Sequence, residues 1–162
     1  MSKLDLMGEK AKKASYKLSV LSSTEKNHAL QKIAARLLEK GDEILKANAL
    51  DIENAKEKGI TGALIDRLTL NSERIKTMAE GVEQIVSLPD PVGEVVSMWR
   101  RPNGLQIGQQ RVPIGVIGII YEARPNVTVD AAALCLKSGN AVILRGGSEA
   151  INSNKAIVSI IK

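Results

Sequence analysis

The sequence predicts an α/β fold in three parts, and three patterns along its 162 residues support this prediction. In residues 1–94, apolar residues recur at three- and four-residue steps, as on the buried face of a helix. Residues 95–112 hold two short apolar segments around an Asn-Gly pair, which is a strong hairpin signal. Residues 113–162 alternate apolar strands with helical segments. We therefore expect a helical region, a β-hairpin and the start of a parallel sheet.

Capping signals divide the helical region into separate helices. Ser22 and Glu25 have the spacing of a capping box, and Asn71 is a second N-cap candidate. Gly59 and Pro89 are expected to end helices. The sequence therefore predicts several successive amphipathic helices before the hairpin.

The last part begins with a continuously apolar segment, residues 114–120, which is typical of a strand covered on both faces. A helix over 127–137 should connect it to a second buried strand over 141–144, so the two strands should be parallel. A further helix is expected over 148–161. This order is half of a nucleotide-binding α/β domain, whose ligands bind where the strands end.

Composition and charge argue against a nucleic-acid partner. Aromatic residues make up only 2% of the chain, which leaves little material for stacking on bases. The net charge of +5 comes from 23 basic and 18 acidic residues that alternate along the helical region. Such a surface is typical of solvated helices, although a mild positive excess also suits an anionic ligand.

The sequence predicts a cytoplasmic protein with no membrane partner. A single cysteine, Cys135, excludes an internal disulfide and fits a reducing compartment. Charged residues interrupt the amino-terminal segment, so no signal peptide is expected. No uncharged apolar stretch reaches the roughly 20 residues that a spanning helix needs.

The segment Arg145-Gly146-Gly147-Ser148-Glu149 lies between a strand and a helix and is a candidate anion-binding loop. Its glycines would let the backbone approach an anion, and free N–H groups at the helix start can bind phosphate. Arg145 adds a planar, permanently charged group suited to phosphate. The alternative is a plain turn in which Ser148 caps the helix, and the loop alone leaves both open.

The segment Arg124-Pro125-Asn126 follows the first strand of the predicted sheet. Pro125 favours an extended conformation for Arg124. Asn126 could cap the following helix, or its amide could donate to a developing oxyanion. The spacing leaves both possibilities open.

Four other residues are interpreted as structural. Gly115 and Gly118 lie in the first strand and indicate close backbone packing. Cys135 lies in an Ala- and Leu-rich helix, where a free thiol is commonly buried. His28 is the only histidine, so no histidine-rich metal site can be built and no metal is expected.

Two longer motifs resemble the γ-glutamyl phosphate reductases (glutamate-5-semialdehyde dehydrogenases) of the aldehyde dehydrogenase superfamily. They are YEARPN at residues 121–126 and SGNAVILRGGSE at residues 138–149, and RPNGL at residues 101–105 agrees with them. The resemblance covers essentially the whole chain and about the first two-fifths of such an enzyme. It implies that residues 113–162 begin the Rossmann-like sheet of the aldehyde dehydrogenase fold, left incomplete here.

The resemblance also implies a reaction in proline biosynthesis, a branch of amino-acid biosynthesis. As an NADP-dependent oxidoreductase, the full-length enzyme would reduce L-glutamyl 5-phosphate with NADPH to L-glutamate 5-semialdehyde and release phosphate. A cysteine of the superfamily attacks the acyl carbon, and its position falls beyond Lys162. The chain alone is therefore expected to be inactive, and the full-length enzyme is expected to be a homo-oligomer.

Residue roles follow from the same resemblance. Asn126 matches the asparagine that stabilises the oxyanion, and Arg124 is a candidate substrate ligand. Arg145 falls where the superfamily contacts the cofactor's adenosine ribose, and an arginine there suits the 2′-phosphate of NADPH. Gly146, Gly147, Ser148 and Glu149 complete that cofactor-binding turn.

One alternative of a different class stays open. The chain could be a non-catalytic nucleotide-binding or protein-interaction module that acts through its hairpin. A reading frame that continues to an unpaired cysteine would favour the reductase, and a stop codon after residue 162 would favour the module.

Overall fold

The computed structural model describes residues 2–162, so Met1, the first residue of the expected helical region, lies outside the described residues. The helical region contains α1 Lys3–Leu18, α2 Ser23–Glu39, α3 Gly41–Glu57, α4 Ala63–Leu68 and α5 Ser72–Ser87. The strands β1 Val95–Arg100 and β2 Gln106–Gln110 follow. The rest is β3 Val116–Ile120, α6 Pro125–Lys137, β4 Ala141–Arg145, the 3₁₀ helix η1 Ser148–Ala150 and α7 Ile151–Ile161. The fold is the α/β order that the sequence predicts.

The predicted helix boundaries are confirmed by their caps. The Ser22 hydroxyl accepts the N–H of Glu25 at 3.2 Å, and the Glu25 carboxylate accepts the N–H of Ser22 at 2.8 Å. The Asn71 side chain accepts the N–H of Arg74 at 2.7 Å at the start of α5. The helix α3 ends shortly before Gly59, whose φ of 74° lies in the left-handed region that glycine adopts easily.

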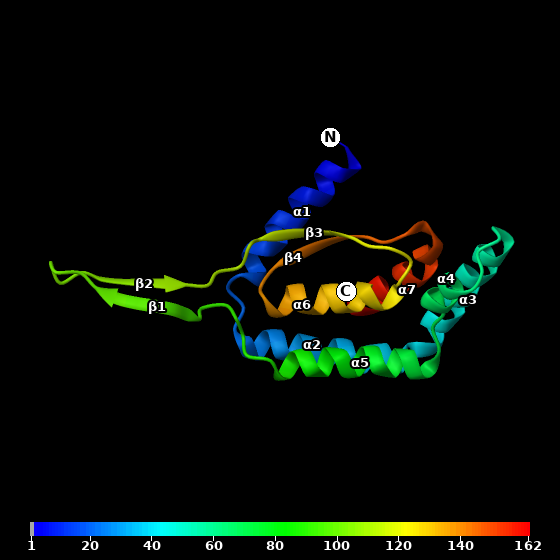
Figure 1. Ribbon diagram of the computed structural model, residues 1–162, viewed down its shortest axis with the longest axis horizontal. Helices are drawn as coiled ribbons and strands as arrows, with labels where there is room; N and C mark the ends of the chain where they lie inside the picture. The colour runs from blue at the N-terminus through cyan, green and yellow to red at the C-terminus, as the bar shows by residue number, and fades with distance from the viewer. Residues whose placement is uncertain (1) are drawn as a thin grey trace.

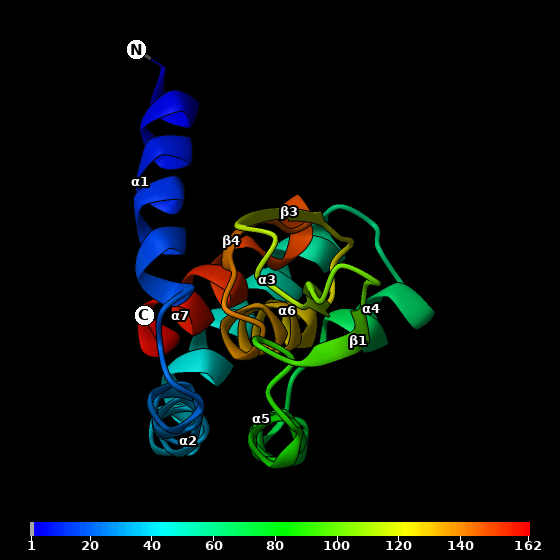
Figure 2. The same ribbon diagram turned by 90° about the vertical axis from the view of Figure 1, so that its left-hand side faces the viewer.

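The main apolar core lies among the helices. Helices α2 and α5 lie side by side and are seen end-on in Figure 2. Helices α6 and α7 pack against them, so the last part of the chain joins the same core. The most deeply buried members are Leu30, Leu37, Ile44, Val82, Val129 and Ile157. In α2, the buried residues Leu30, Ala34 and Leu37 have the four- and three-residue steps of the apolar stripe that the sequence predicts.

The hairpin β1–β2 projects from the rest of the molecule (Figure 1). Its strands are antiparallel, with Trp99 opposite Ile107. Asn103 and Gly104 form the predicted turn, in which Gly104 has a φ of 88° and its N–H donates to the carbonyl of Arg101 at 2.9 Å. Most hairpin side chains are exposed, including the apolar residues Val95, Val96, Met98 and Trp99.

Strands β3 and β4 pair in parallel, from Val116 opposite Ala141 to Ile120 opposite Arg145, as predicted. Helices α1 and α6 both contact β4. The expected cover on both faces of β3 is not found, because Ile120 is 76% exposed. Within residues 2–162 the sheet has only these two strands, so the apolar side chains of β3 lack further neighbours.

The interpretation of Gly115 and Gly118 as close-packing residues is wrong. A Cβ atom at either position would have no other atom within 4 Å. Gly115 precedes β3 with a φ of 118°, so its backbone conformation is what favours glycine. The structure provides no comparable reason for Gly118.

Candidate functional site

The loops that follow β3 and β4 lie side by side at one edge of the sheet. The N–H of Tyr121 donates to the carbonyl of Arg145 at 3.1 Å. A Cβ atom at Gly146 would lie 3.1 Å from the Tyr121 ring, and one at Gly147 would lie 3.1 Å from the backbone nitrogen of Ala123. The nearest contacts are the Asn154 amide for Gly146 and the Glu149 carboxylate for Gly147, so close packing at this edge leaves little room for a side chain at either glycine. The approach of an anion to this backbone, which the sequence predicts, stays a prediction.

A chain of buried hydroxyl and amide groups fixes this edge to the helices behind it. The hydroxyl of Thr128 in α6 donates to the Asn154 side-chain oxygen in α7 at 2.7 Å. The Tyr121 hydroxyl lies 2.6 Å from the same Thr128 oxygen, so Tyr121 is the donor in that pair. Thr128 and Asn154 are both buried. The loop after β3 is therefore tied to both helices.

The amino terminus of α7 is already occupied by a carboxylate of the protein. Asp51 in α3, only 1% exposed, accepts the N–H groups of Asn152 at 3.1 Å and Ser153 at 2.7 Å. The expectation that free N–H groups at this helix start bind phosphate is wrong for these two residues. Sequence reasoning missed Asp51 because its partners lie about 100 positions later.

The alternative in which Ser148 caps the helix is also wrong. The Ser148 hydroxyl donates to the Glu149 carboxylate at 3.0 Å, and residues 148–150 form η1 before α7 begins at Ile151. The hydrogen bond from Ser148 and one from Glu149's own backbone N–H lower the pKa of Glu149. A glutamate is ionised at neutral pH, and these hydrogen bonds stabilise that ionised form.

Arg145 lies on an open cleft of about 430 Å³ at the ends of β3 and β4. The other lining residues come from β3, the loops and α7: Ile120, Tyr121, Gly146, Gly147, Ser148 and Ile151. The Arg145 side chain is exposed and forms no ion pair within residues 2–162. Its guanidinium therefore remains available to an anionic ligand.

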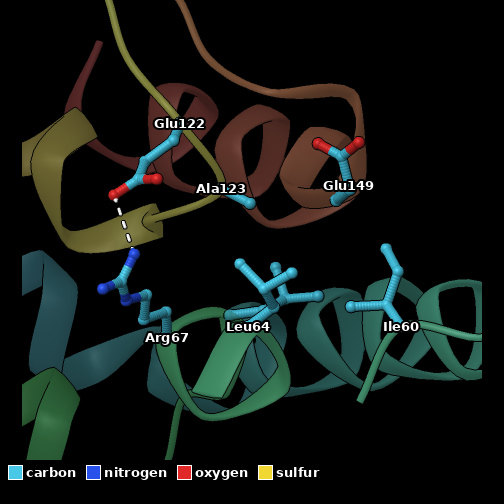
Figure 3. Close-up of a pocket in the computed structure, with 7 residues that line it drawn as sticks. Ile60, Leu64, Arg67, Glu122, Ala123 and Glu149 are labelled. Atoms are coloured by element: carbon cyan, nitrogen blue, oxygen red, sulfur yellow. Dashed lines mark hydrogen bonds and ion pairs between the residues drawn. The ribbon is translucent and has the colours of Figure 1, made fainter. Parts of the chain in front are cut away.

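Glu149 lines a different cavity, of about 220 Å³, shown in Figure 3. There Ile60, Leu64 and Arg67 lie opposite the segment from Glu122 to Ala123 and the Glu149 side chain. Arg67 crosses the gap to the Glu122 carboxylate at 3.4 Å. The structure thus separates Glu149 from the cleft that holds the other four residues of the predicted loop.

Arg124 and Asn126 share a third cavity, of about 470 Å³, between the start of α6 and helices α4 and α5. Helix α6 begins at Pro125 with Arg124 as its N-cap residue, in the extended conformation that the proline predicts. The alternative in which Asn126 caps the helix is wrong, because proline favours the first helical position and moves the helix start ahead of Asn126. The Asn126 amide instead donates to Asp130 at 3.4 Å.

The charges around this third cavity are unevenly paired. Glu122 is the single carboxylate near both Arg67, at 3.4 Å, and Arg124, at 3.1 Å. The contact with Arg124 is an ion pair without hydrogen-bond geometry, so the buried Nε–H of Arg124 has no hydrogen-bond partner within residues 2–162. Asp130 is half-buried and forms no ion pair within the same range. Burial raises the pKa of Asp130, and the Asn126 hydrogen bond opposes that effect.

Sequence reasoning missed Arg67, Arg74 and Asp130 as members of this cavity. The two arginines belong to the helical region and cannot be told from ordinary surface charges without knowing that α5 packs against α6. Asp130 did carry a signal, because it lies four residues after Asn126 in a predicted helix. That spacing places the two side chains on the same helix face.

Cys135 is buried, as predicted, and burial raises the pKa of its thiol. His28 lies exposed on α2. Within residues 2–162, no group of three or more His, Cys, Asp or Glu side chains could hold a metal ion. No helix in the described part of the chain is long and apolar enough to cross a membrane.

Comparison with known structures defines the class of fold. A propionaldehyde dehydrogenase from a Clostridium phytofermentans fucose utilisation bacterial microcompartment matches with a TM-score of 0.63 at 15% identity. The match covers 99% of this chain and 33% of that one. The chain therefore has the fold of the corresponding part of an aldehyde dehydrogenase. No family model matches the chain.

Proteins with higher identity to the chain are gamma-glutamyl phosphate reductases. The gamma-glutamyl phosphate reductase of Heliobacterium modesticaldum is 66% identical over 99% of this chain and 38% of its own length. That of Caldicellulosiruptor bescii is 64% identical over 100% of this chain and 39% of its own length. The crystal structure of the Thermotoga maritima enzyme matches with a TM-score of 0.96 and 52% identity, covering 99% of this chain and 39% of that one. The chain is therefore similar to gamma-glutamyl phosphate reductases and spans about two-fifths of their length.

Proposed function

We propose that these residues form part of an NADPH-dependent reductase that converts L-glutamyl 5-phosphate to L-glutamate 5-semialdehyde in proline biosynthesis. The observation that carries the proposal is the 64–66% identity to gamma-glutamyl phosphate reductases along the whole chain. In this reaction NADPH supplies a hydride to the acyl carbon, and inorganic phosphate leaves. We place the enzyme in the cytoplasm, in keeping with the single buried thiol.

The first set of residues acts on the substrate. One N–H of the Asn126 amide is directed to Asp130 and the other is uncommitted, so it can donate to the oxyanion that develops on the acyl group. Arg124 lines the same cavity and shares the Glu122 carboxylate with Arg67, so its guanidinium can bind an anionic group of the substrate. Cys135 lies in the core, so the attacking thiol in this proposal belongs to the remainder of the full-length enzyme.

The second set binds the cofactor. The exposed Arg145 guanidinium beside Gly146, Gly147 and Ser148 fits an anionic phosphate, and we assign it to the 2′-phosphate of NADPH. We also assign the Glu149 carboxylate to a ribose hydroxyl, because it is hydrogen-bonded to Ser148 of the same turn, while its side chain lines the neighbouring cavity. Charge and hydrogen bonding support this assignment.

The test is an assay of a full-length enzyme that carries these 162 residues. Purified protein should reduce NADP⁺ when given glutamate semialdehyde and inorganic phosphate together. Omission of phosphate should stop the reaction, because the acyl phosphate cannot form without it. A folded full-length enzyme that reduces no NADP⁺ under these conditions would refute the proposal.

We also propose that the full-length enzyme is a homo-oligomer that associates through the hairpin. The projecting strands expose Val95, Val96, Met98 and Trp99, an apolar surface that a second copy could cover. Light scattering should show a larger assembly for the wild type than for a Trp99→Glu variant. An unchanged assembly in that variant would exclude this hairpin face from the contact.

A further inference from the structure

The Asp130 carboxylate is the least compensated charge in the cavity that holds Asn126. It is half-buried in α6, and its one hydrogen bond is the 3.4 Å contact from the Asn126 amide. The opposite side of the cavity is different, since Arg74 is bound to the Asp66 carboxylate at 2.8 Å and to the Thr69 carbonyl at 2.7 Å. Removing a carboxylate from water without a cation is costly, so such groups concentrate at functional sites.

The cavity offers opposite charges at separate places. Arg67 and Arg124 share the single carboxylate of Glu122, which leaves excess positive charge at one end. Asp130 provides an unpaired negative charge one helical turn beyond Asn126. Buried Leu70 and Met78 line the wall between α5 and α6. A ligand that fits this arrangement has anionic groups, a cationic group and an apolar chain between them.

The proposed substrate has those features in the required order. Its acyl carbon is placed at Asn126, and two methylene groups separate that carbon from the one that carries the α-ammonium group. An ammonium group is the strongest partner for an ionised carboxylate, because its three N–H donors form charge-assisted hydrogen bonds. The burial that raises the pKa of Asp130 would then be offset when the cation binds.

We propose that Asp130 binds the α-ammonium group of the amino-acid substrate and so selects it over chains of the same length without an amine. This inference rests on the proposed function, because it concerns the substrate of that reaction. Asp130 would be a specificity-determining residue next to the oxyanion donor.

The experiment compares two aldehydes in a full-length enzyme that carries these residues. Glutamate semialdehyde has the α-amine, and 5-oxopentanoate has the same chain without it. The wild type should prefer glutamate semialdehyde. Asp130→Asn keeps the size and an oxygen acceptor for Asn126 but removes the charge, so kcat/KM for glutamate semialdehyde should fall about tenfold to a hundredfold, mostly through KM. The value for 5-oxopentanoate should stay the same.

Controls separate this role from a purely positional one. If Asp130 only orients Asn126, the Asp130→Asn variant should lose kcat equally for both aldehydes or retain both, and either result would overturn the proposal. Asp130→Ser provides a smaller second variant, with thermal melting as the check on folding. Glu80→Gln on the exposed side of α5 is the matched control and should leave the preference unchanged.

The outcome also distinguishes the two levels of inference. A wild type that oxidises neither aldehyde would contradict the proposed function itself. A wild type that oxidises glutamate semialdehyde, with an Asp130→Asn variant of unaltered preference, would overturn only the role of Asp130.

Discussion

The two loops at the edge of the β3–β4 sheet differ in how their polar groups are satisfied. Behind the loop after β4, the buried Asp51 carboxylate accepts hydrogen bonds from both Asn152 and Ser153 at the first turn of α7. At the loop after β3, the Nε–H of Arg124 has no hydrogen-bond partner in residues 2–162, and Asp130 has no ion pair there. Satisfied buried groups hold a site in place, whereas unsatisfied ones mark where a ligand completes the bonding.

This comparison predicts that substitutions at the first set change stability, whereas substitutions at the second set change catalysis or specificity. Four variants test this contrast, in order of decreasing effect.

Asn126→Ala should give the largest effect, and on turnover. Loss of an oxyanion donor costs about 10²–10³ in kcat. The free energy of unfolding should change little, because the Asn126 side chain is exposed and does not cap α6. Steady-state kinetics and thermal melting of the full-length enzyme measure both. Near-normal turnover with a lowered melting temperature would place Asn126 among the structural residues.

Asp51→Ala should give the opposite result. Its carboxylate accepts hydrogen bonds from the backbone and side chains of both Asn152 and Ser153. The variant would leave buried donors without partners, so the free energy of unfolding should fall by about 2–4 kcal/mol. Denaturant titration measures this fall, with the exposed Glu53→Ala in the same helix as the control. Unchanged stability would show that the network behind β4 does not hold the site.

Arg145→Ala tests the cofactor side of the edge. Loss of a charge-assisted contact costs about 1.5–3 kcal/mol, so KM for NADPH should rise about tenfold to a hundredfold. KM for NADH should change much less, because NADH lacks the 2′-phosphate. Equal changes for the two cofactors would reject this role for Arg145.

The sequence predicts most accurately where the determining interactions are local. The capping box of Ser22 and Glu25 and the turn at Asn103 and Gly104 each depend on neighbours within three or four residues. Of the two roles that the sequence leaves open for Asn126, the cap is wrong, because Pro125 starts the helix earlier than the apolar pattern does. Local signals therefore predict the elements and their order reliably.

The composition of the site depends on tertiary packing and was harder to predict. Two motifs predict Arg124 and Asn126 after the first strand of the sheet and Arg145 at the end of the second. The structure places them after β3 and at the end of β4, where they line two separate cavities. Arg67 and Arg74 join Arg124 and Asn126 only because α5 packs against α6 and brings the end of α4 to the same cavity. The contacts of Asp51 depend in the same way on how α3 packs against α7. No periodicity in one sequence encodes which helix faces meet.

The smallest expected effect is the pH-dependent difference in stability between the Asp130→Asn variant and the wild type. Burial holds the pKa of Asp130 above its ordinary value of 3.8 in the folded protein, so the folded state binds this proton more tightly than the unfolded state does. Tighter proton binding in the folded state adds to the free energy of unfolding. This contribution is fully present below the pKa that Asp130 has in the unfolded chain, and it is lost as the pH rises through its pKa in the folded protein. Ionised Asp130 should therefore destabilise the wild type at neutral pH.

The neutral asparagine lacks this penalty. Asp130→Asn should be more stable than the wild type at pH 7, by less than about 1 kcal/mol, and the difference should vanish as the pH falls below the ordinary value of 3.8. The charged groups on the same cavity are Asp66, Arg67, Arg74 and Arg124, and attraction from the arginines would reduce the difference. Melting temperatures of the two proteins between pH 4 and pH 8 measure it. A wild type that is the more stable protein at pH 7 would mean that these arginines already compensate Asp130, and the contrast between the two loops would then be lost at this residue.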